Sequence, residues 1–442
     1  MKQKFTQFYL SVTLIMGLMF TSSVIHAQEE VKLSKEDSLG NVLKDARKDL
    51  DILKKLKISG YILAEWQKAD TAGIGSFAGG NFPANSNNRY MVREARIKFL
   101  YGTDLNQFVM QFDVSEKGLS TKDMYFKMTD PIINWFSLYA GIMNRPFGWE
   151  IAYSSANRES PERARFTQTL FPGERDLGAQ LSINPNKNSP LNFIHLDAGL
   201  FNGNGINPET DNKKDFIGHL WISKTNRNEN ISYGLGVSLY NGYVFQGTKY
   251  VYKMGDVATG VKGFVVDSTS TNKTKFATRQ YIGFDGQFSI VSPIGLSVLR
   301  GEYVFGTQPG SNATSTSPTV AINYDTYIRK FNAFYVYFVQ NIAQTKHQIV
   351  IKYDVYDPNT DIAGTGINGT INGKKTKLGT TDIKYSTLGL GYLYHFNNNI
   401  KFELYYDLVS NEVTGIKGTT ALNNYTKDLA DNVLTLRLTY KF

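Results

Sequence analysis

From residue 58 to the end of the chain, hydrophobic and polar residues alternate with a period of two. The last segment shows this most clearly, because residues 434–442 alternate Leu, Leu, Leu, Tyr and Phe with Thr, Arg, Thr and Lys. The same alternation occurs in residues 231–239, 388–396 and 401–408. Successive side chains of a strand point to opposite faces, so each segment predicts a strand with one apolar face and one polar or glycine face.

Segments of this kind recur through the chain, and the links between them alternate in length. We expect sixteen strands, near residues 57–67, 89–101, 106–115, 121–129, 134–144, 176–184, 192–201, 215–223, 230–240, 276–289, 295–306, 330–340, 347–356, 384–396, 399–409 and 431–442. The long links lie near 68–88, 145–175, 202–214, 241–275, 307–329, 357–383 and 410–430, with a shorter member of this set at 116–120. The short links lie near 102–105, 130–133, 184–191, 225–229, 290–294, 341–346 and 397–398.

Long loops at one rim and tight turns at the other are typical of a transmembrane β-barrel. Only helices and closed barrels satisfy all their backbone groups inside a bilayer. The sequence therefore predicts an all-β fold, a transmembrane antiparallel barrel of sixteen strands over residues 57–442, with a short N-terminal helix. Residues 249–253 and 263–267 can pair as one more hairpin, so eighteen strands is the alternative.

The first 27 residues have the pattern of an export signal. Lys2 and Lys4 precede an apolar run over residues 8–24, which ends near Ala27. We expect cleavage near Ala27 and delivery to the outer membrane of a Gram-negative bacterium, and an uncleaved membrane anchor is the alternative.

A helix is predicted over residues 34–56, within an expected periplasmic segment 28–56. Its apolar residues recur at steps of four and three, namely Leu39, Leu43, Ala46, Leu50 and Leu53. This spacing is that of a short heptad seam. The segment is interpreted either as a periplasmic coiled coil that joins copies of the chain or as a single amphipathic helix lying against the barrel base.

Composition narrows these interpretations. The 442 residues are 41% hydrophobic and 13% aromatic, so the chain is too apolar for a disordered protein. Cysteine is absent, which excludes disulfides, thiol catalysis and cysteine-ligated metal sites. The formal net charge is +9, and removing Lys2 and Lys4 leaves +7. We expect the many aromatic side chains to face lipid or form interfacial girdles rather than a packed core.

The polar strand faces should line a lumen, where their charges set the ionic environment. The expected lumen-wall residues carry both signs of charge: Glu94, Arg96, Lys98, Lys127, Arg300, Glu302 and Lys352. The favoured interpretation is that most of these residues form ion pairs that stiffen the wall. The alternative is a transverse field at the narrowest point of a channel.

The link 145–175 is dense in charged and aromatic residues. Its arginines are Arg145, Arg158, Arg163, Arg165 and Arg175. A wide barrel needs something to narrow it, so we expect this third long loop to fold inward as a constriction. Its guanidinium groups would then bind anions. The alternative is an outward loop in which Arg and Glu pair with each other.

Several segments carry a resemblance to a known family. They are residues 93–99 (REARIKF), 141–148 (GIMNRPFG), 154–155 (SS), 162–163 (ER) and 172–178 (PGERDLG). With these segments the chain resembles the phosphate-selective porin O and P family of outer-membrane porins, most specifically over residues 89–184. The resemblance implies a sixteen-stranded trimeric porin with an inward third loop and a basic lumen that guides phosphate or similar anions. The chain departs from the family pattern at Asn144, where the family usually has Lys.

The expected function is that of an outer-membrane porin for passive diffusion of small hydrophilic solutes, with anions such as phosphate favoured. No enzyme activity, cofactor, metal or nucleic-acid partner is expected. The expected partners are outer-membrane lipids and lipopolysaccharide, two further copies of the chain, and the barrel-assembly machinery through the C-terminal Phe442. One alternative is a non-conducting structural or adhesion barrel. The other is an outer-membrane hydrolase, which would use a histidine such as His195 or His219 with a nearby serine.

Overall fold

The computed structural model describes residues 35–442 apart from 117 and 321–322. The expected export signal at 1–27 lies outside the described residues. Helix α2 spans Lys35–Lys54, within the predicted range, and the chain enters the barrel unit at Leu56. The seam residues Leu43, Leu50 and Leu53 are 53%, 53% and 62% exposed. None of the described helices is long and apolar enough to cross a membrane.

Every strand expected from the alternation is present. In chain order the strands are β1 (Leu56–Ala69), β2 (Asn88–Gly102), β3 (Asn106–Ser115), β4 (Gly118–Thr129), β5 (Phe136–Asn144), β6 (Arg175–Ile183), β7 (Ile194–Phe201), β8 (Asp215–Thr225), β9 (Ile231–Phe245), β10 (Val251–Ala258), β11 (Val261–Asp267), β12 (Phe276–Ser292), β13 (Gly295–Gly310), β14 (Thr326–Asn341), β15 (His347–Asp357), β16 (Thr370–Ile371), β17 (Lys374–Lys375), β18 (Tyr385–His395), β19 (Ile400–Asn411) and β20 (Val433–Lys441). Short helices lie in three loops: α3 (Arg165–Leu170), η1 (Ser270–Asn272), η2 (Gly364–Gly366) and η3 (Thr380–Asp382), of which the last two share one loop.

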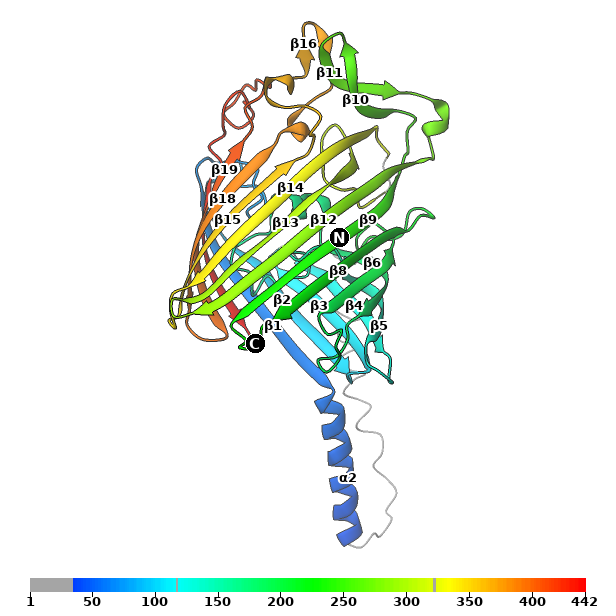
Figure 1. Cartoon of the computed structure of the whole chain (residues 1–442), viewed down its shortest axis with the longest axis vertical. Coiled ribbons are helices and arrows are strands. Elements are labelled where there is room, and N and C mark those ends of the chain that lie inside the picture. Colours follow the sequence, from blue (N-terminus) through cyan, green and yellow to red (C-terminus); the bar gives the residue numbers. More distant parts are fainter. Residues whose placement is uncertain (1–34, 117, 321–322) are drawn as a thin grey trace, which may run out of the picture. The chain divides into compact units, whose positions relative to one another are not determined.

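The sheet closes on itself. Each barrel strand pairs antiparallel with the next, and β1 also pairs with β20, from Tyr61 opposite Lys441 to Ala69 opposite Val433. The closed barrel consists of β1–β9, β12–β15 and β18–β20, which is sixteen strands (Figure 1). The predicted fold class is therefore confirmed.

The eighteen-strand alternative is wrong. Residues 251–267 do form the hairpin β10–β11, but β9 pairs directly with β12 and leaves this hairpin out of the wall. The hairpin lies among the long loops (Figure 1), where β10 runs parallel to the start of β14 over Val251–Lys253. Apolar and polar residues alternate only weakly in this hairpin, because neither of its faces belongs to the barrel wall.

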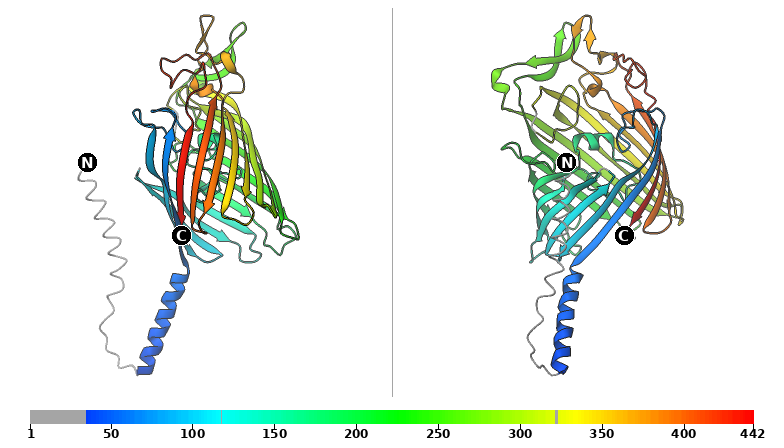
Figure 2. Two further views of the ribbon diagram at one scale, coloured as in Figure 1. Left: turned by 90° about the vertical axis from the view of Figure 1, so that its left-hand side faces the viewer. Right: turned by 180° about the vertical axis from the view of Figure 1, so that it is seen from behind.

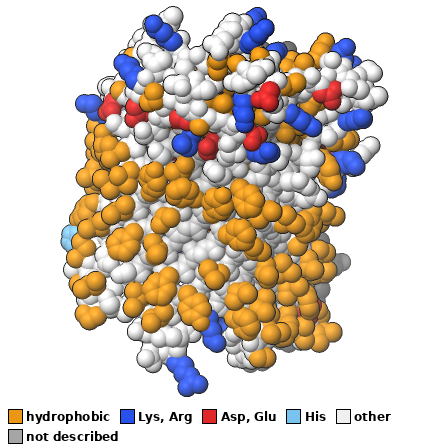
Figure 3. All heavy atoms as spheres, turned by 45° about the horizontal axis from the view of Figure 1, so that its top comes forward, with side chains coloured by type: hydrophobic (Ala, Val, Ile, Leu, Met, Phe, Trp, Pro, Cys, Tyr) orange, Lys and Arg blue, Asp and Glu red, His pale blue; other side chains and the backbone are white. Residues whose placement is uncertain are grey.

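The two faces of the wall differ as the period of two requires. In β14, Tyr335 and Tyr337 are 1% exposed, whereas Val336 and Phe338 between and beside them are 43% and 41% exposed. The exposed apolar side chains cover most of the wall seen in Figure 3, and charged side chains gather over the long loops at its upper end. A broad apolar belt on the outside of a closed barrel is the surface that a bilayer covers.

Several strands extend further toward the long loops than the alternation predicts. The pairing of β9 with β12 continues to Phe245 opposite Phe276, and that of β13 with β14 to Gly310 opposite Tyr327. Backbone pairing does not need lipid on one face, so these strands continue beyond the apolar belt. The alternation of apolar and polar residues therefore stops at the edge of the apolar belt, before the strands themselves end.

Candidate functional site: the barrel interior

The link between β5 and β6 runs through the inside of the barrel. The right-hand view of Figure 2 shows it, with α3 in teal, enclosed by the wall. Inward-facing groups of several wall strands hold its backbone and side chains. These groups include Arg93 on β2, Ser238 on β9, Glu302 on β13, Tyr337 on β14, Lys352 on β15, Lys401 on β19 and Arg437 on β20.

Glu302 is the acceptor at the start of this link. Its Oε1 receives the backbone N–H groups of Trp149 and Glu150 at 2.7 and 2.5 Å and the Tyr335 hydroxyl at 2.6 Å. The neighbouring Gly148 has φ of +61°, and a Cβ there would lie 2.3 Å from Glu302 Oε2. Glycine is therefore required at 148, because any side chain would push the loop off its acceptor.

One side of the loop is apolar and packs on the wall. Phe147, Phe166 and Phe171 belong to a buried cluster with wall residues such as Tyr240 and Tyr335. Phe171 lies 6.0 Å from the Tyr240 ring and Phe166 lies 6.1 Å from the Tyr335 ring, both stacked. The expectation that aromatic side chains avoid a packed core is thus wrong for this part of the barrel. The loop supplies apolar side chains that turn a lumen wall into a core.

Arg145 does not face open space. Its Nε lies 3.1 Å from Asp176 Oδ2, and both side chains are almost fully buried. Asp176 also accepts the Leu177 backbone N–H. This arginine joins the end of β5 to the start of β6 at the base of the loop, and it is placed to hold structure rather than to meet solutes.

Arg145→Ala should destabilise the barrel without changing ion selectivity. Removing one member of a buried ion pair leaves an uncompensated charge, which costs about 3–5 kcal/mol. Urea unfolding of the protein in lipid vesicles, followed by tryptophan fluorescence, measures this loss. The double variant Arg145→Met with Asp176→Leu should recover most of it. Normal stability combined with altered selectivity would show that Arg145 meets the permeating solute.

Arg158 and Arg163 stabilise the loop from within. Arg158 donates to the backbone oxygens of Ser160 and Pro161 at 3.1 and 2.6 Å. Arg163 donates to the Glu150 backbone oxygen at 3.1 Å and pairs with Glu174 at 2.7 Å. The loop therefore combines the two expected arrangements, since it lies inside the barrel and its Arg and Glu side chains also pair with each other.

Arg175 is the first residue of β6. Its guanidinium bridges Asp123 on β4 at 3.0 Å and Glu174 at 2.6 Å. Arg163 and Arg175 thus share Glu174, and both line the same cavity. Of the five expected arginines, these two are brought together, whereas Arg145 and Arg158 are buried elsewhere.

Arg165 is held in a different way. Its guanidinium carbon lies 4.3 Å from the Phe77 ring centroid and 3.8 Å from that of Tyr385. Its Nε is buried and has no hydrogen-bond partner among the described residues. Neither ring is among the residues expected at the site, because the contacts join two loops and the start of β18, which are far apart in the sequence.

Most of the expected wall charges are paired. Glu94 accepts from the Tyr61 hydroxyl at 2.9 Å and pairs with Arg96 at 3.0 Å. Arg300 pairs with Glu159 of the loop. Lys352 lies 3.4 Å from Asp354 and donates to the Glu162 backbone oxygen at 3.2 Å.

Lys98 and Lys127 differ from these wall residues. Neither forms an ion pair within the described part of the chain, and Lys127 lies 5.6 Å above the Tyr139 ring. Both are half-buried on the inner face of the wall. They are the expected wall cations that no carboxylate of the described chain neutralises.

A cluster of charges joins the loop to the seam where the barrel closes. Glu162 pairs with Arg93 on β2 at 2.5 Å and lies 3.6 Å from Arg437 on β20. Arg437 in turn pairs with Glu65 on β1. The loop, the first two strands and the last strand therefore meet at one ionic cluster, of which Arg93 and Arg437 were not among the expected site residues.

Two cavities lie between the loop and the short-turn rim. One, of about 500 Å³, is lined by Arg96, Lys98, Arg163, Arg175 and Lys441 but by a single acidic side chain, that of Asp123. The other, of about 640 Å³, is lined by Trp149 and Trp221 together with Lys187, Lys224 and Glu229. The loop thus divides the barrel interior. At the first cavity Arg96, Arg163 and Arg175 pair with carboxylates, whereas Lys98 and Lys441 form no ion pair among the described residues.

Sequence comparison gives no relative: no protein-family model matches the chain, and no curated protein matches it. Solved structures do match. OprB of Pseudomonas putida, in its high-pH structure, has a TM-score of 0.52 at 10% identity, over 90% of this chain and 97% of that chain. An anion-selective porin from Comamonas acidovorans has a TM-score of 0.50 at 9% identity, over 88% of this chain and 99% of that chain.

The fold is that of the outer-membrane porins. At these identities the likeness concerns the fold alone. Among the described residues, no group of three or more His, Asp or Glu side chains could hold a metal ion. His219 lies 2.9 Å from Asp285 and has no serine hydroxyl as a hydrogen-bond partner in the described chain.

Proposed function

We propose that this protein is an outer-membrane porin for the passive diffusion of small hydrophilic solutes, with a preference for anions such as phosphate. The observation that supports it best is the cavity of about 500 Å³ inside the barrel, which five Lys or Arg side chains and one Asp line. Lys98 and Lys441 form no ion pair among the described residues, and unpaired charge of one sign in a confined aqueous space raises the local concentration of the opposite ion. The porin fold and the apolar outer belt support the membrane location.

Within this proposal the residues have distinct roles. Lys98 and Lys127 attract anions from the wall, and Lys98 lines the 500 Å³ cavity together with Arg163 and Arg175. Arg165 lines a cavity on the side of the inward loop that faces the other long loops. Arg145 and Arg158 keep the loop in place. No catalytic residue, cofactor or metal is part of the proposal.

The proposed partners follow from the surfaces. Three copies would associate, with the exposed seam of α2 as a coiled coil in the periplasm after removal of residues 1–27. Phe442, which is 56% exposed at the end of β20, would be read by the barrel-assembly machinery. Exposed lysines of the long loops, such as Lys374 and Lys375, would contact lipopolysaccharide.

Recording of the refolded protein in a planar bilayer tests the channel. In a potassium chloride gradient we expect steps of conductance and a reversal potential on the anion side. Millimolar phosphate added to the chloride solution should reduce the chloride current. A barrel without conductance would favour the structural or adhesion alternative. A reversal potential on the cation side would refute the anion preference while leaving the channel in place.

A further inference from the structure

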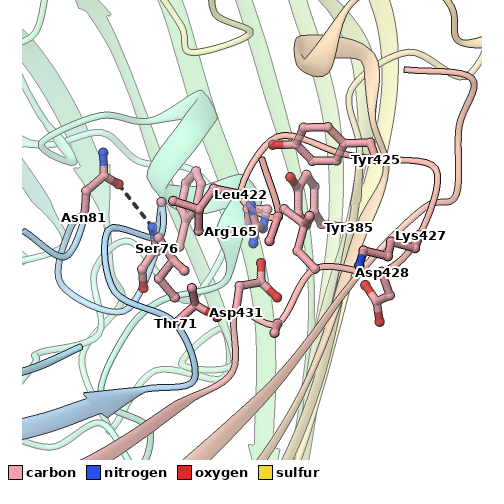
Figure 4. Close-up of a pocket in the computed structure, with 16 residues that line it drawn as sticks. Thr71, Ser76, Asn81, Arg165, Tyr385, Leu422, Tyr425, Lys427, Asp428 and Asp431 are labelled. Carbon is pink, nitrogen blue, oxygen red and sulfur yellow. Dashed lines mark hydrogen bonds between the residues drawn. The ribbon is translucent and has the colours of Figure 1, made fainter. Parts of the chain in front are cut away.

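A separate cavity of about 240 Å³ lies on the long-loop side of the inward loop. Its walls come from the link between β1 and β2, from Arg165 at the start of α3, from Tyr385 at the start of β18 and from the link between β19 and β20. Figure 4 shows Arg165, Tyr385 and Asp431 converging between the loop that carries Ser76 and Asn81 and the loop that carries Leu422 and Tyr425. This cavity and the 500 Å³ cavity have no lining residue in common. The inward loop contributes Arg165 to the first and Arg163 to the second.

One polar group of this cavity is the Arg165 guanidinium. The Phe77 and Tyr385 rings lie 4.3 and 3.8 Å from its central carbon, which fixes its plane. The buried Nε has no hydrogen-bond partner among the described residues. Guanidinium groups bind carboxylates through N–H groups at their edge, and that edge is what ring stacking leaves open.

The second polar group is the Asp431 carboxylate, which is 6% exposed. Its Oδ1 is buried and has no hydrogen-bond partner among the described residues. Burial raises the pKa of Asp431 to about 7. The nearby Asp428 carboxylate raises this pKa further, whereas the Arg165 guanidinium lowers it. A buried carboxylate oxygen without a donor is costly, and a ligand that brings a charged donor removes that cost. The adjacent Asp428 differs, because Ser410 and the Asn411 backbone already bond to it.

The remaining wall selects the kind of ligand. Ile74, Leu422 and Leu429 give it an aliphatic side. Arg165 and Lys427 balance Asp428 and Asp431 in charge, which suits a ligand with no net charge. Arg165 covers one face each of Phe77 and Tyr385, and Tyr425 is the third ring of the wall.

We propose that this cavity binds a small zwitterion, an α-amino acid with an aliphatic side chain, whose carboxylate meets Arg165 and whose ammonium group meets Asp431. The aliphatic side chain lies against Ile74, Leu422 and Leu429. The site is placed at the long-loop side of the barrel, so it would gather its ligand before the inward loop. Binding there does not depend on conduction, and the proposal can fail or succeed separately from the channel.

Calorimetric titration of the detergent-solubilised full-length protein with L-leucine tests the site. Leucinamide lacks the carboxylate, and 4-methylpentanoate lacks the ammonium group. We expect saturable binding of leucine and at least tenfold weaker binding of both analogues, because each loses one charge-assisted contact. Glucose should not bind. Equal affinities for leucine and its analogues, no leucine binding at millimolar concentration, or binding of glucose in place of leucine would overturn the proposal.

Two variants assign the contacts. Asp431→Asn should weaken leucine binding at least tenfold and leave 4-methylpentanoate binding unchanged, because only the ammonium contact is lost. Arg165→Gln should do the reverse, weakening leucine but not leucinamide. Lys417→Gln, an exposed change in the same long loop as Asp431, serves as the control and should bind leucine normally. Should Arg165→Gln fail to fold, Asp431→Asn alone decides, and an unchanged leucine affinity in it would refute the assignment.

Discussion

Replacing residues 146–173 by a short Gly-Ser turn should raise the single-channel conductance roughly threefold or more, because a sixteen-strand barrel without its inward segment is an open pore. The replacement is feasible in this chain, since Asn144 and Arg175 are paired neighbours on β5 and β6 and a tight turn can join them. The variant should also lose stability, because Tyr240, Tyr281 and Phe331 would then face water in place of Phe147 and Phe171.

The matched control removes a segment of similar kind from another long loop. Deletion of the hairpin β10–β11, residues 251–267, should leave the conductance near that of the unaltered protein, because that hairpin lies outside the wall. Planar-bilayer recording compares the three proteins. An inward-loop variant with unaltered conductance would mean that the loop does not limit the current.

The double change Lys98→Glu and Lys127→Glu should move the reversal potential from the anion side to the cation side. These are the expected wall cations without an ion-pair partner in the described chain, so reversing them changes the field along the lumen wall rather than breaking a structural pair. The cavity of about 500 Å³ would then contain glutamate in place of Lys98, beside Asp123. Confined charges of this kind set the sign of selectivity.

Lys253→Glu with Lys262→Glu is the matched control. It changes the net charge by the same amount, but both lysines are exposed on the β10–β11 hairpin. The reversal potential of this control should keep its sign, and its dependence on salt should be unaltered. If both double variants shift the potential equally, the selectivity arises from the net charge of the loops and not from the wall.

The barrel could be predicted from the sequence because its rule is local. In a strand such as β14, consecutive residues alternate between the lipid-facing and the inward-facing side of the wall. The length of the link after a strand indicates at which rim of the barrel that strand ends. The ends of β9 and β13 could not be predicted in this way, because their last residues pair beyond the apolar belt. The β10–β11 hairpin shows the same limit, since pairing alone does not distinguish a wall strand from a loop strand.

The interior was only partly predictable, because its contacts are long-range. The density of charged and aromatic residues in 145–175 indicated a folded segment, and Glu302 was expected on the lumen face. Which arginine faces a cavity depends on partners that no pattern near it reveals: Asp176 for Arg145, Glu174 for Arg163, and the distant Phe77 and Tyr385 for Arg165. Asp431 belongs to no motif. Its place in the 240 Å³ cavity depends on contact between the β1–β2 link, the inward loop and the β19–β20 link.

The ionic cluster at the closing seam bears on how the molecule is assembled. Arg437 on the last strand faces Glu65 on the first strand and Glu162 of the inward loop. If the first and last strands paired while the loop was still outside, Arg93 and Arg437 would be enclosed without the Glu162 carboxylate. Arg437 would keep Glu65 as its partner in such a barrel, whereas Arg93 would lack its partner Glu162. Entry of the loop therefore completes the cluster, and we expect it to stabilise the pairing of the first strand with the last.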